Sequence, residues 1–284
     1  MQFVTRPVPK NFNIFFLGDL HIGSTLFHER GFRSFIEATK NDYYGVKHNV
    51  IIGMGDYIEA IDTSDKRFDV DTTDLKLIRP EHQMDFFVEA LWEIREKIVV
   101  LLYGNHEDKL LRYCDYVRGA CTDLETEYGT FSSVVTFKNQ DDILFKTFVT
   151  HGRGTVGSTA DSPERRSANM LLQMKRKLHN KSGDCAVMAF GHTHKVLIAE
   201  PERTLYLESN DQAMKQKYTS SNPSDRFIPK DHRWYINTGS FLRLYKQGVS
   251  GYAERAMYDP LELGYPVLRV RDGLIAGVDK VIVM

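Results

Sequence analysis

The sequence predicts an α/β fold, and three observations support this prediction. Short apolar runs typical of buried strands alternate with amphipathic helical segments along the first hundred residues. The second half holds further strand-like runs and only one long helical segment. Hydrophobic residues make up 42% of the 284 residues and aromatic residues 12%, which is enough to bury a sizeable core.

In the first half, three buried strands are expected, at residues 13–17, 50–52 and 98–103. A helix is expected at residues 29–40, because Phe32, Phe35 and Ile36 fall on one face. A second helix is expected to begin at Pro80, since proline fits the first turn and apolar residues follow at spacings of three and four.

In the second half, a β pair is expected at residues 131–137 and 143–150, followed by a helix at 163–179. Polar residues dominate 209–231, which we expect to be a loop or an insertion. Because the chain shows no internal repeat, we expect a single domain spanning residues 1–284. Further strands are expected at 186–190, 196–199, 204–207, 234–237, 266–271 and 274–283.

Charge and cysteine content limit the class of protein. The net charge of -1 excludes a surface that is basic throughout, although it leaves room for a local basic patch. Cys114, Cys121 and Cys185 form no metal or redox motif, which favours a reducing compartment. Residues 1–10 lack a signal-peptide pattern, and no apolar run approaches the roughly 18 residues of a membrane span. We therefore expect a cytoplasmic protein without a membrane partner, and the oligomeric state stays open.

Side chains that bind metal ions follow five of the predicted strands. In open α/β sheets, ligands bind at the carboxyl ends of the strands, so these segments are expected to meet. The segments are Gly18-Asp19-Leu20-His21, Gly53-Met54-Gly55-Asp56, Gly104-Asn105-His106-Glu107, His151-Gly152 and Gly191-His192-Thr193-His194.

The spacing within these segments indicates shared sites. Asp19 and His21 are two residues apart, as are His192 and His194, so in an extended backbone each pair points to one side. Carboxylate, imidazole and amide donors together suit Mn, Fe or Zn better than a thiol-binding metal. One such motif alone is typical of a surface turn, whereas five at strand ends indicate one metal centre. The other histidines lack this context and are interpreted as surface or packing residues: His28, His48, His82, His179 and His232.

In this order the five motifs resemble those of the calcineurin-like metallophosphoesterases, over roughly residues 13 to 240. The resemblance implies a four-layer αββα sandwich, with two mixed β-sheets flanked by helices. It also implies two divalent metal ions, with Mn as the expected metal and Fe, Zn, Ni or Mg as alternatives. One ion would be held by Asp19, His21, Asp56 and His194. The other would be held by Asp56, Asn105, His151 and His192.

The resemblance implies hydrolysis of a phosphate ester by a hydroxide that bridges the two ions. His106 would face the substrate and protonate the leaving group, a role worth about 10²–10⁴-fold in rate. Glu59 stands where relatives with such a pair carry Asp, and could hold His106 through a carboxylate–imidazole hydrogen bond. The alternative for Glu59 is a solvated loop acid.

Two departures from the relatives bear on the substrate. Protein Ser/Thr phosphatases of this superfamily have arginines at the positions of Ala60 and Tyr103, so protein phosphatase activity is not expected. A phosphodiesterase or nuclease is the leading interpretation, and a phosphomonoesterase or pyrophosphatase acting on a small metabolite is the alternative. A scaffold without activity is disfavoured, because every expected ligand and acid position is filled.

Other residues could contact the substrate, including nucleic acid. Asn105 is expected to contact it beside the metal, and Arg153 follows His151 closely enough to reach a phosphate, unless it belongs to a flexible turn. The basic side chains of the helix at 163–179 and just beyond it form either a solvated face or a track for a polyanion. They are Arg165, Arg166, Lys175, Arg176, Lys177 and Lys181.

Overall fold

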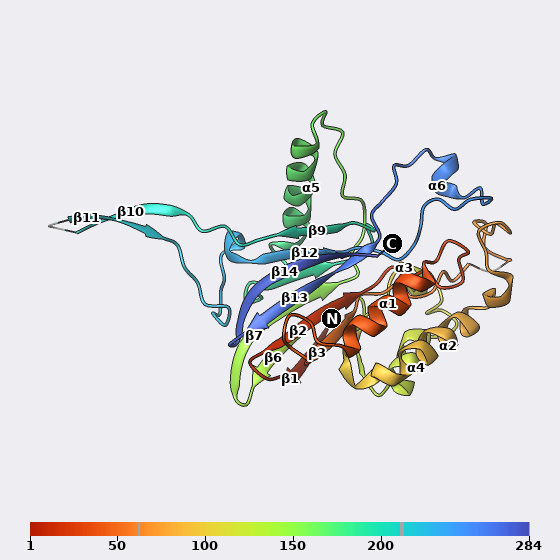
Figure 1. The fold of residues 1–284 in the computed structure, drawn as a ribbon, viewed down its shortest axis with the longest axis horizontal. Helices are drawn as coiled ribbons and strands as arrows, with labels where there is room; N and C mark the ends of the chain where they lie inside the picture. Colours follow the sequence, from red (N-terminus) through yellow and green to blue (C-terminus); the bar gives the residue numbers. More distant parts are fainter. Residues whose placement is uncertain (62, 211–212, 284) are drawn as a thin grey trace.

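The computed structural model describes residues 1–61, 63–210 and 213–283. Two six-stranded sheets form the centre of the molecule, with helices outside them and a long β-hairpin projecting to one side (Figure 1). Each sheet combines parallel and antiparallel pairs, as expected for a mixed α/β fold.

The first sheet has the strand order β14-β13-β2-β3-β4-β5. Four neighbouring strands of this sheet, β2, β3, β4 and β5, are parallel. Their carboxyl ends therefore lie at the same edge of the sheet. All residues of β2 and β3 are buried, because both faces of the sheet are covered. The strands are β2 (Phe12–Leu17), β3 (Asn49–Gly53), β4 (Ile98–Leu101), β5 (Glu127–Tyr128), β13 (Gly264–Arg271) and β14 (Leu274–Ile282).

The second sheet has the strand order β1-β6-β7-β8-β12-β9. Strands β7, β8 and β12 are parallel to one another, and β6 and β7 form the expected antiparallel pair. The strands are β1 (Gln2–Pro7), β6 (Ser132–Asn139), β7 (Asp142–Thr150), β8 (Val187–Phe190), β9 (Val196–Ala199) and β12 (Trp234–Thr238).

Helices cover the outer faces of both sheets. Helices α1, α2 and α4 lie on the first sheet and α5 on the second (Figure 1). The α-helices are α1 (Glu29–Lys40), α2 (Pro80–Leu91), α3 (Asn105–Asp108), α4 (Tyr116–Asp123), α5 (Pro163–Leu178) and α6 (Tyr252–Arg255). Short 3₁₀ segments occupy Leu75–Leu77, Trp92–Lys97 and Lys230–His232.

Three apolar clusters separate the four layers. Phe15 of the first sheet packs edge-to-face on Phe35 of α1, with ring centroids 5.9 Å apart. Phe12 and Phe137 meet between the sheets at 5.4 Å. Met174 of α5 is buried in the cluster on the far side of the second sheet. The layers are thus helix, sheet, sheet and helix, and the expected αββα sandwich is confirmed.

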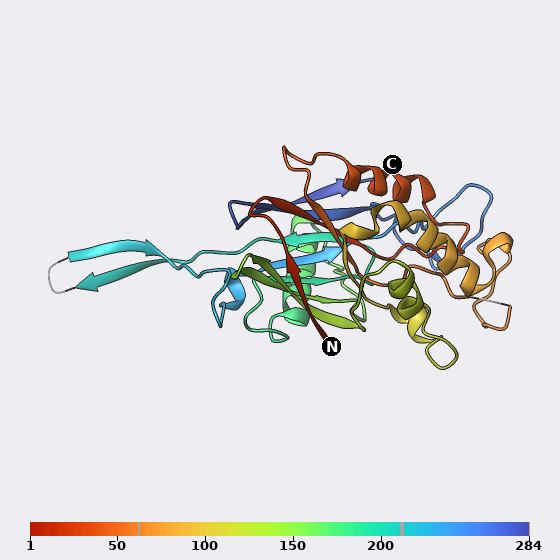
Figure 2. The same ribbon diagram turned by 90° about the horizontal axis from the view of Figure 1, so that it is seen from below.

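A hairpin formed by β10 (Leu205–Asn210) and β11 (Ala213–Tyr218) extends away from the sheets (Figures 1 and 2). The stretch 209–231, expected to be a loop or insertion, therefore includes a strand, although residues 211–212 of it lie outside the described residues. Polar residues on β11 concealed the strand, because no apolar alternation marks it. Strand β1 and helix α4 were not expected either.

We propose that residues 1–284 form a single domain. Each sheet combines strands from distant parts of the chain, since β13 pairs with β2 and β1 with β6. Within the described part of the chain, no helix is both long and apolar enough to cross a membrane.

Candidate metal centre

The carboxyl ends of β2, β3, β4, β7 and β8 bring the predicted ligands together. These seven residues, here called the ligand cluster, come from five separate segments that meet at one end of the two sheets. They are Asp19, His21, Asp56, Asn105, His151, His192 and His194.

One half of the ligand cluster contains Asp19, His21 and His194, whose donor atoms all lie within 4.8 Å of one another. The Nε2 atom of His194 is 3.3 Å from Asp19 Oδ1 and 3.2 Å from His21 Nε2. Asp19 Oδ1 is buried and has no hydrogen-bond donor among the described residues. A buried carboxylate oxygen facing two imidazole nitrogens is suited to a shared cation.

The other half contains Asp56, His151 and His192, again with donor atoms within 4.8 Å. The Nε2 atom of His151 is 3.0 Å from Asn105 Oδ1 and 3.3 Å from Asp56 Oδ2. The amide of Asn105 therefore adds an oxygen to this half, where the sequence placed it.

Asp56 lies between the two halves. Its Oδ2 atom is 3.3 Å from His151 Nε2 and 3.9 Å from His21 Nε2, while Oδ1 accepts a hydrogen bond from the backbone N–H of His106. One carboxylate oxygen thus faces both histidines, which is the position that a bridging ligand needs.

The histidines are held in the orientation that metal-binding imidazoles adopt. Nδ1 of His21 donates to Glu59 Oε2 at 2.7 Å, and Nδ1 of His151 donates to the carbonyl of Met54 at 2.8 Å. Because Nδ1 is engaged in a hydrogen bond, Nε2 of each ring faces the other potential metal ligands. Carboxylate–histidine and carbonyl–histidine metal sites have the same arrangement. The residues therefore fit two divalent ions.

The calcineurin-like phosphoesterase family model matches residues 12–196, which is more than half of the chain. The chain belongs to the calcineurin-like phosphoesterase family. It is thus a metal-dependent phosphoesterase. Among solved structures, the chain is similar to a conserved uncharacterized protein of Streptococcus pneumoniae TIGR4, a predicted phosphoesterase, at 12% identity and a TM-score of 0.32. That match covers 97% of this chain and 100% of the other. A search of curated proteins finds no match.

Electrostatics in the phosphoesterase favour cation binding. Burial lowers the pKa of His21 and of His151, but Glu59 and Asp56 respectively outweigh it and raise each pKa to about 9. Burial also opposes ionisation of Asp56, yet His151 and His106 hold its pKa well below the usual value. The Asp56 carboxylate stays charged in a buried place, where a divalent cation compensates it strongly.

Five residues of the ligand cluster have left-handed backbone conformations. The φ angles are 51° for Asp19, 56° for His21, 53° for Asp56, 68° for His192 and 57° for His194. The expectation of extended Asp19–His21 and His192–His194 segments is therefore wrong, although each pair still points to one place. Such conformations cost about 1–2 kcal/mol per residue and persist where surrounding contacts hold them.

Backbone contacts supply this support. The carboxylate of Glu107 accepts hydrogen bonds from the N–H groups of Asp56, Tyr57, Ile58 and Gly104, at 2.7 to 3.1 Å. Burial raises the pKa of Glu107 to about 7, with a smaller contribution from Asp56, while these N–H donors favour the charged form. Gly104 allows the close approach, because a Cβ there would lie 2.1 Å from Asp56 Oδ1.

Of the two roles left open for Glu59, the hydrogen bond from its carboxylate to His106 is not formed. Glu59 Oε2 is 3.9 Å from His106 Nδ1, and it binds His21 instead. His106 Nδ1 donates to the backbone carbonyl of Glu59 at 2.5 Å. Glu59 thus contacts both histidines, one through its carboxylate and one through its backbone, and the two imidazole rings pack edge-to-face with centroids 4.6 Å apart.

Other residues singled out in the sequence lie outside the ligand cluster. Arg153 is exposed and donates to Asp108 at 3.3 Å. Ala60 is buried, and Tyr103 packs against Tyr128 and Phe131, so neither position offers a cation. On α5, Lys175 pairs with Glu202 and Lys177 donates to the carbonyl of Arg153.

A cavity of about 860 Å³ opens over the ligand cluster. Its further walls come from residues 61, 66–72 and 242–261, which the sequence did not assign to the site. These segments carry four cations that the family motifs do not include: Lys66, Arg67, Arg243 and Arg255. The resemblance extends only to about residue 240, and the segment 242–261 begins just beyond it.

Proposed function

We propose that this phosphoesterase is a binuclear, manganese-dependent phosphodiesterase. The observation behind the proposal is that Asp56 Oδ2 faces His21 of one half of the ligand cluster and His151 of the other. In this proposal the first ion binds Asp19, His21, Asp56 and His194, and the second binds Asp56, Asn105, His151 and His192.

When bound, the two ions polarise the phosphoryl oxygens and lower the pKa of coordinated water towards neutrality. His106 supplies the proton for the leaving group. Its Nδ1 is engaged by the carbonyl of Glu59, which leaves Nε2 free beside the cavity. Burial lowers the pKa of His106, so its protonated form is a stronger acid while a smaller fraction of the ring is protonated at neutral pH.

The environment of the ligand cluster favours a diester over a monoester. A monoester dianion carries one more negative charge than a diester and so gains more from nearby cations. The positions that carry arginine in protein phosphatases here hold buried Ala60 and aromatic-packed Tyr103. Arg67 and Arg255 in the cavity wall are each paired, with Asp65 and Asp69 respectively.

A second candidate, a phosphomonoesterase, is favoured by the cations in the cavity wall. A nuclease that uses α5 as its track receives less support. No α5 residue lines the described part of the cavity, and Lys175 and Lys177 are already engaged. The basic face of α5 therefore fits a solvated helix surface better.

The substrate class is tested with matched nitrophenyl esters, the mono- and the bis-substituted phosphate, and a single-stranded oligonucleotide, all with manganese. We expect the bis ester to be hydrolysed faster than the mono ester. A monoester rate ten times the diester rate would make the phosphomonoesterase the better assignment.

The metal ligands are tested with Asp56→Ala, which should remove both ions because Asp56 faces both halves of the ligand cluster. Elemental analysis should find two ions in the wild type and in the control Asp85→Ala, which alters an exposed acid on α2. Two tight ions retained in a folded Asp56→Ala protein would show that Asp56 does not bridge.

For the compartment we propose the cytoplasm. Cys114, Cys121 and Cys185 are all free thiols. Burial raises the pKa of Cys121 to about 12 and that of Cys185 to about 11, so both behave as unreactive core residues.

A further inference from the structure

The cavity over the ligand cluster is larger than a phosphate group requires. Its volume of about 860 Å³ falls within the range of sites that enclose an organic ligand. The ligand cluster forms its floor. Residue 61 and the residues of 66–72 and 242–261 that face the cavity form what we call the outer wall.

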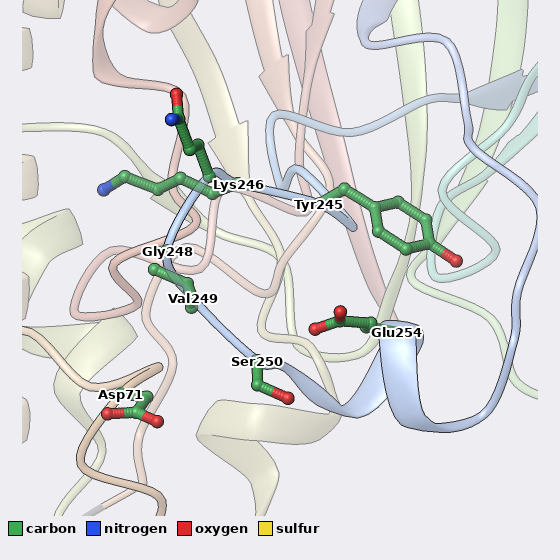
Figure 3. A pocket seen from close by; sticks show the side chains of 8 residues that line it. Asp71, Tyr245, Lys246, Gly248, Val249, Ser250 and Glu254 are labelled. Carbon is green, nitrogen blue, oxygen red and sulfur yellow. The ribbon is translucent and has the colours of Figure 1, made fainter.

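Several contacts hold the segments that form the outer wall in place. Arg255 pairs with Asp69, which joins its two segments, and Lys246 donates to the carbonyl of Thr25 at 2.8 Å. Tyr245 donates to the carbonyl of Ala253 at 3.4 Å. Figure 3 shows the 245–250 loop, Glu254 and Asp71 around a second hollow of about 570 Å³. The wall is therefore shaped before a ligand enters.

Arg243 is the notable cation of the outer wall. It is half-buried, it faces the cavity, and its guanidinium has no hydrogen-bond or ion-pair partner among the described residues. It also lies close to the floor, because the N–H of Phe241, two residues earlier, donates to the carbonyl of Asp19 at 3.0 Å. A partly desolvated guanidinium without a partner is suited to an anionic group of a ligand.

Aromatic and aliphatic side chains line the same cavity as Arg243. Tyr252 and Tyr258 pack edge-to-face at 5.4 Å, and their hydroxyl groups are 2.7 Å apart. Both rings line the cavity yet remain largely exposed. Exposed aromatic faces beside a phosphate site stack well on planar rings such as a nucleobase. Five apolar side chains also line the cavity: Leu26, Phe68, Leu242, Leu244 and Leu261.

We infer that the substrate is a small nucleotide-like phosphoester. Its reacting phosphate lies on the floor, a second anionic group binds Arg243, and a planar ring stacks on Tyr252 and Tyr258. This inference rests on the proposed function, since it assigns the reacting phosphate to the ligand cluster. A long polynucleotide is the competing substrate, and it would need cations along its backbone. Within the described residues, the cations that line the cavity all belong to the outer wall.

Calorimetric titration of the manganese-loaded protein, with each probe checked for hydrolysis afterwards, tests the inference through binding rather than turnover. The probes are inorganic phosphate, adenosine 5′-monophosphate, adenosine 5′-diphosphate and a single-stranded oligonucleotide. We expect the monophosphate to bind at least about tenfold more tightly than phosphate, and the diphosphate a further tenfold.

Two variants separate the roles of the outer wall. Arg243→Gln should weaken binding of the diphosphate by about ten- to a hundredfold and leave inorganic phosphate unchanged. The double variant Tyr252→Leu and Tyr258→Leu should weaken both nucleotides by about tenfold and again spare phosphate. The control Arg226→Gln alters an exposed arginine outside the cavity and should leave the affinity for every probe unchanged. Because it is titrated with the same nucleotides, it also corrects for manganese that they bind in solution.

Three outcomes would overturn the inference: equal affinity for phosphate and the monophosphate, an equal loss of both phosphate and diphosphate in Arg243→Gln, or tightest binding of the oligonucleotide. Failure of the proposed function looks different. It would appear as nucleotides bound with the expected pattern but no turnover of any nitrophenyl ester. Failure of the outer-wall inference alone would leave turnover intact.

Discussion

The floor and the outer wall of the cavity are built in different ways. Floor residues lie at the ends of buried strands, and hydrogen bonds of the main chain hold them, including the four that Glu107 accepts. The outer wall consists of surface segments tied by side-chain contacts such as Arg255–Asp69. The difference indicates that the fold fixes the chemistry rigidly, whereas the choice of substrate depends on loops that can change with little effect on stability.

The largest effect on this comparison is expected from His106→Gln, which removes the proposed acid from the floor. We expect turnover to fall by about 10²–10⁴-fold, most for substrates with poor leaving groups, because those need protonation. Elemental analysis should still find both ions. The exposed histidine variant His82→Gln serves as a control. Loss of one ion with retained chemistry would make His106 a ligand instead.

Glu107→Gln tests the backbone frame of the floor. The amide group would face N–H donors that the carboxylate now accepts, and each unsatisfied buried donor costs about 1–3 kcal/mol. With two donors affected, we expect the free energy of unfolding to fall by about 2–6 kcal/mol, measured by denaturant unfolding. Glu89→Gln, at an exposed position of α2, should be neutral. An equal, small effect of both would show that the frame does not depend on Glu107.

Glu59→Gln distinguishes the two contacts of Glu59. The carboxylate orients His21, so its loss should weaken manganese binding by about 10–100-fold. The backbone carbonyl that holds His106 remains, so the dependence of rate on the leaving group should not change. Metal titration and a leaving-group series measure the two effects. A change confined to the leaving-group series would mean that the carboxylate acts on His106.

The smallest effect is expected in the outer wall, from Arg255→Gln. Breaking its exposed pair with Asp69 should cost about 0–1 kcal/mol of stability. Steady-state kinetics should show a KM raised a few-fold with kcat unchanged, because the floor is untouched. Arg33→Gln breaks a similar exposed pair with Glu29 on α1 and should leave KM unchanged. A large fall in kcat for Arg255→Gln would remove the distinction between floor and wall.

The sequence predicted the buried strands and amphipathic helices closely, because they depend on local periodicity. Helix α1 occupies the expected residues 29–40, and β9 the expected 196–199. Strand β11 was missed, because its polar residues show no apolar alternation. The two-residue spacing grouped His192 with His194, but the reason given was wrong, since both residues adopt left-handed rather than extended backbone.

By itself, the sequence determined which residue types gather at the strand ends, because a buried strand followed by glycine and a metal-binding side chain is a local pattern. It also determined that arginine is absent at Ala60 and Tyr103. Only the tertiary structure decided that Glu59 binds His21, and that Arg243, Tyr252 and Tyr258 face the same cavity as the ligand cluster. Such contacts join residues up to about two hundred positions apart, and they depend on how the surface segments pack over the sheets rather than on any local preference of the chain.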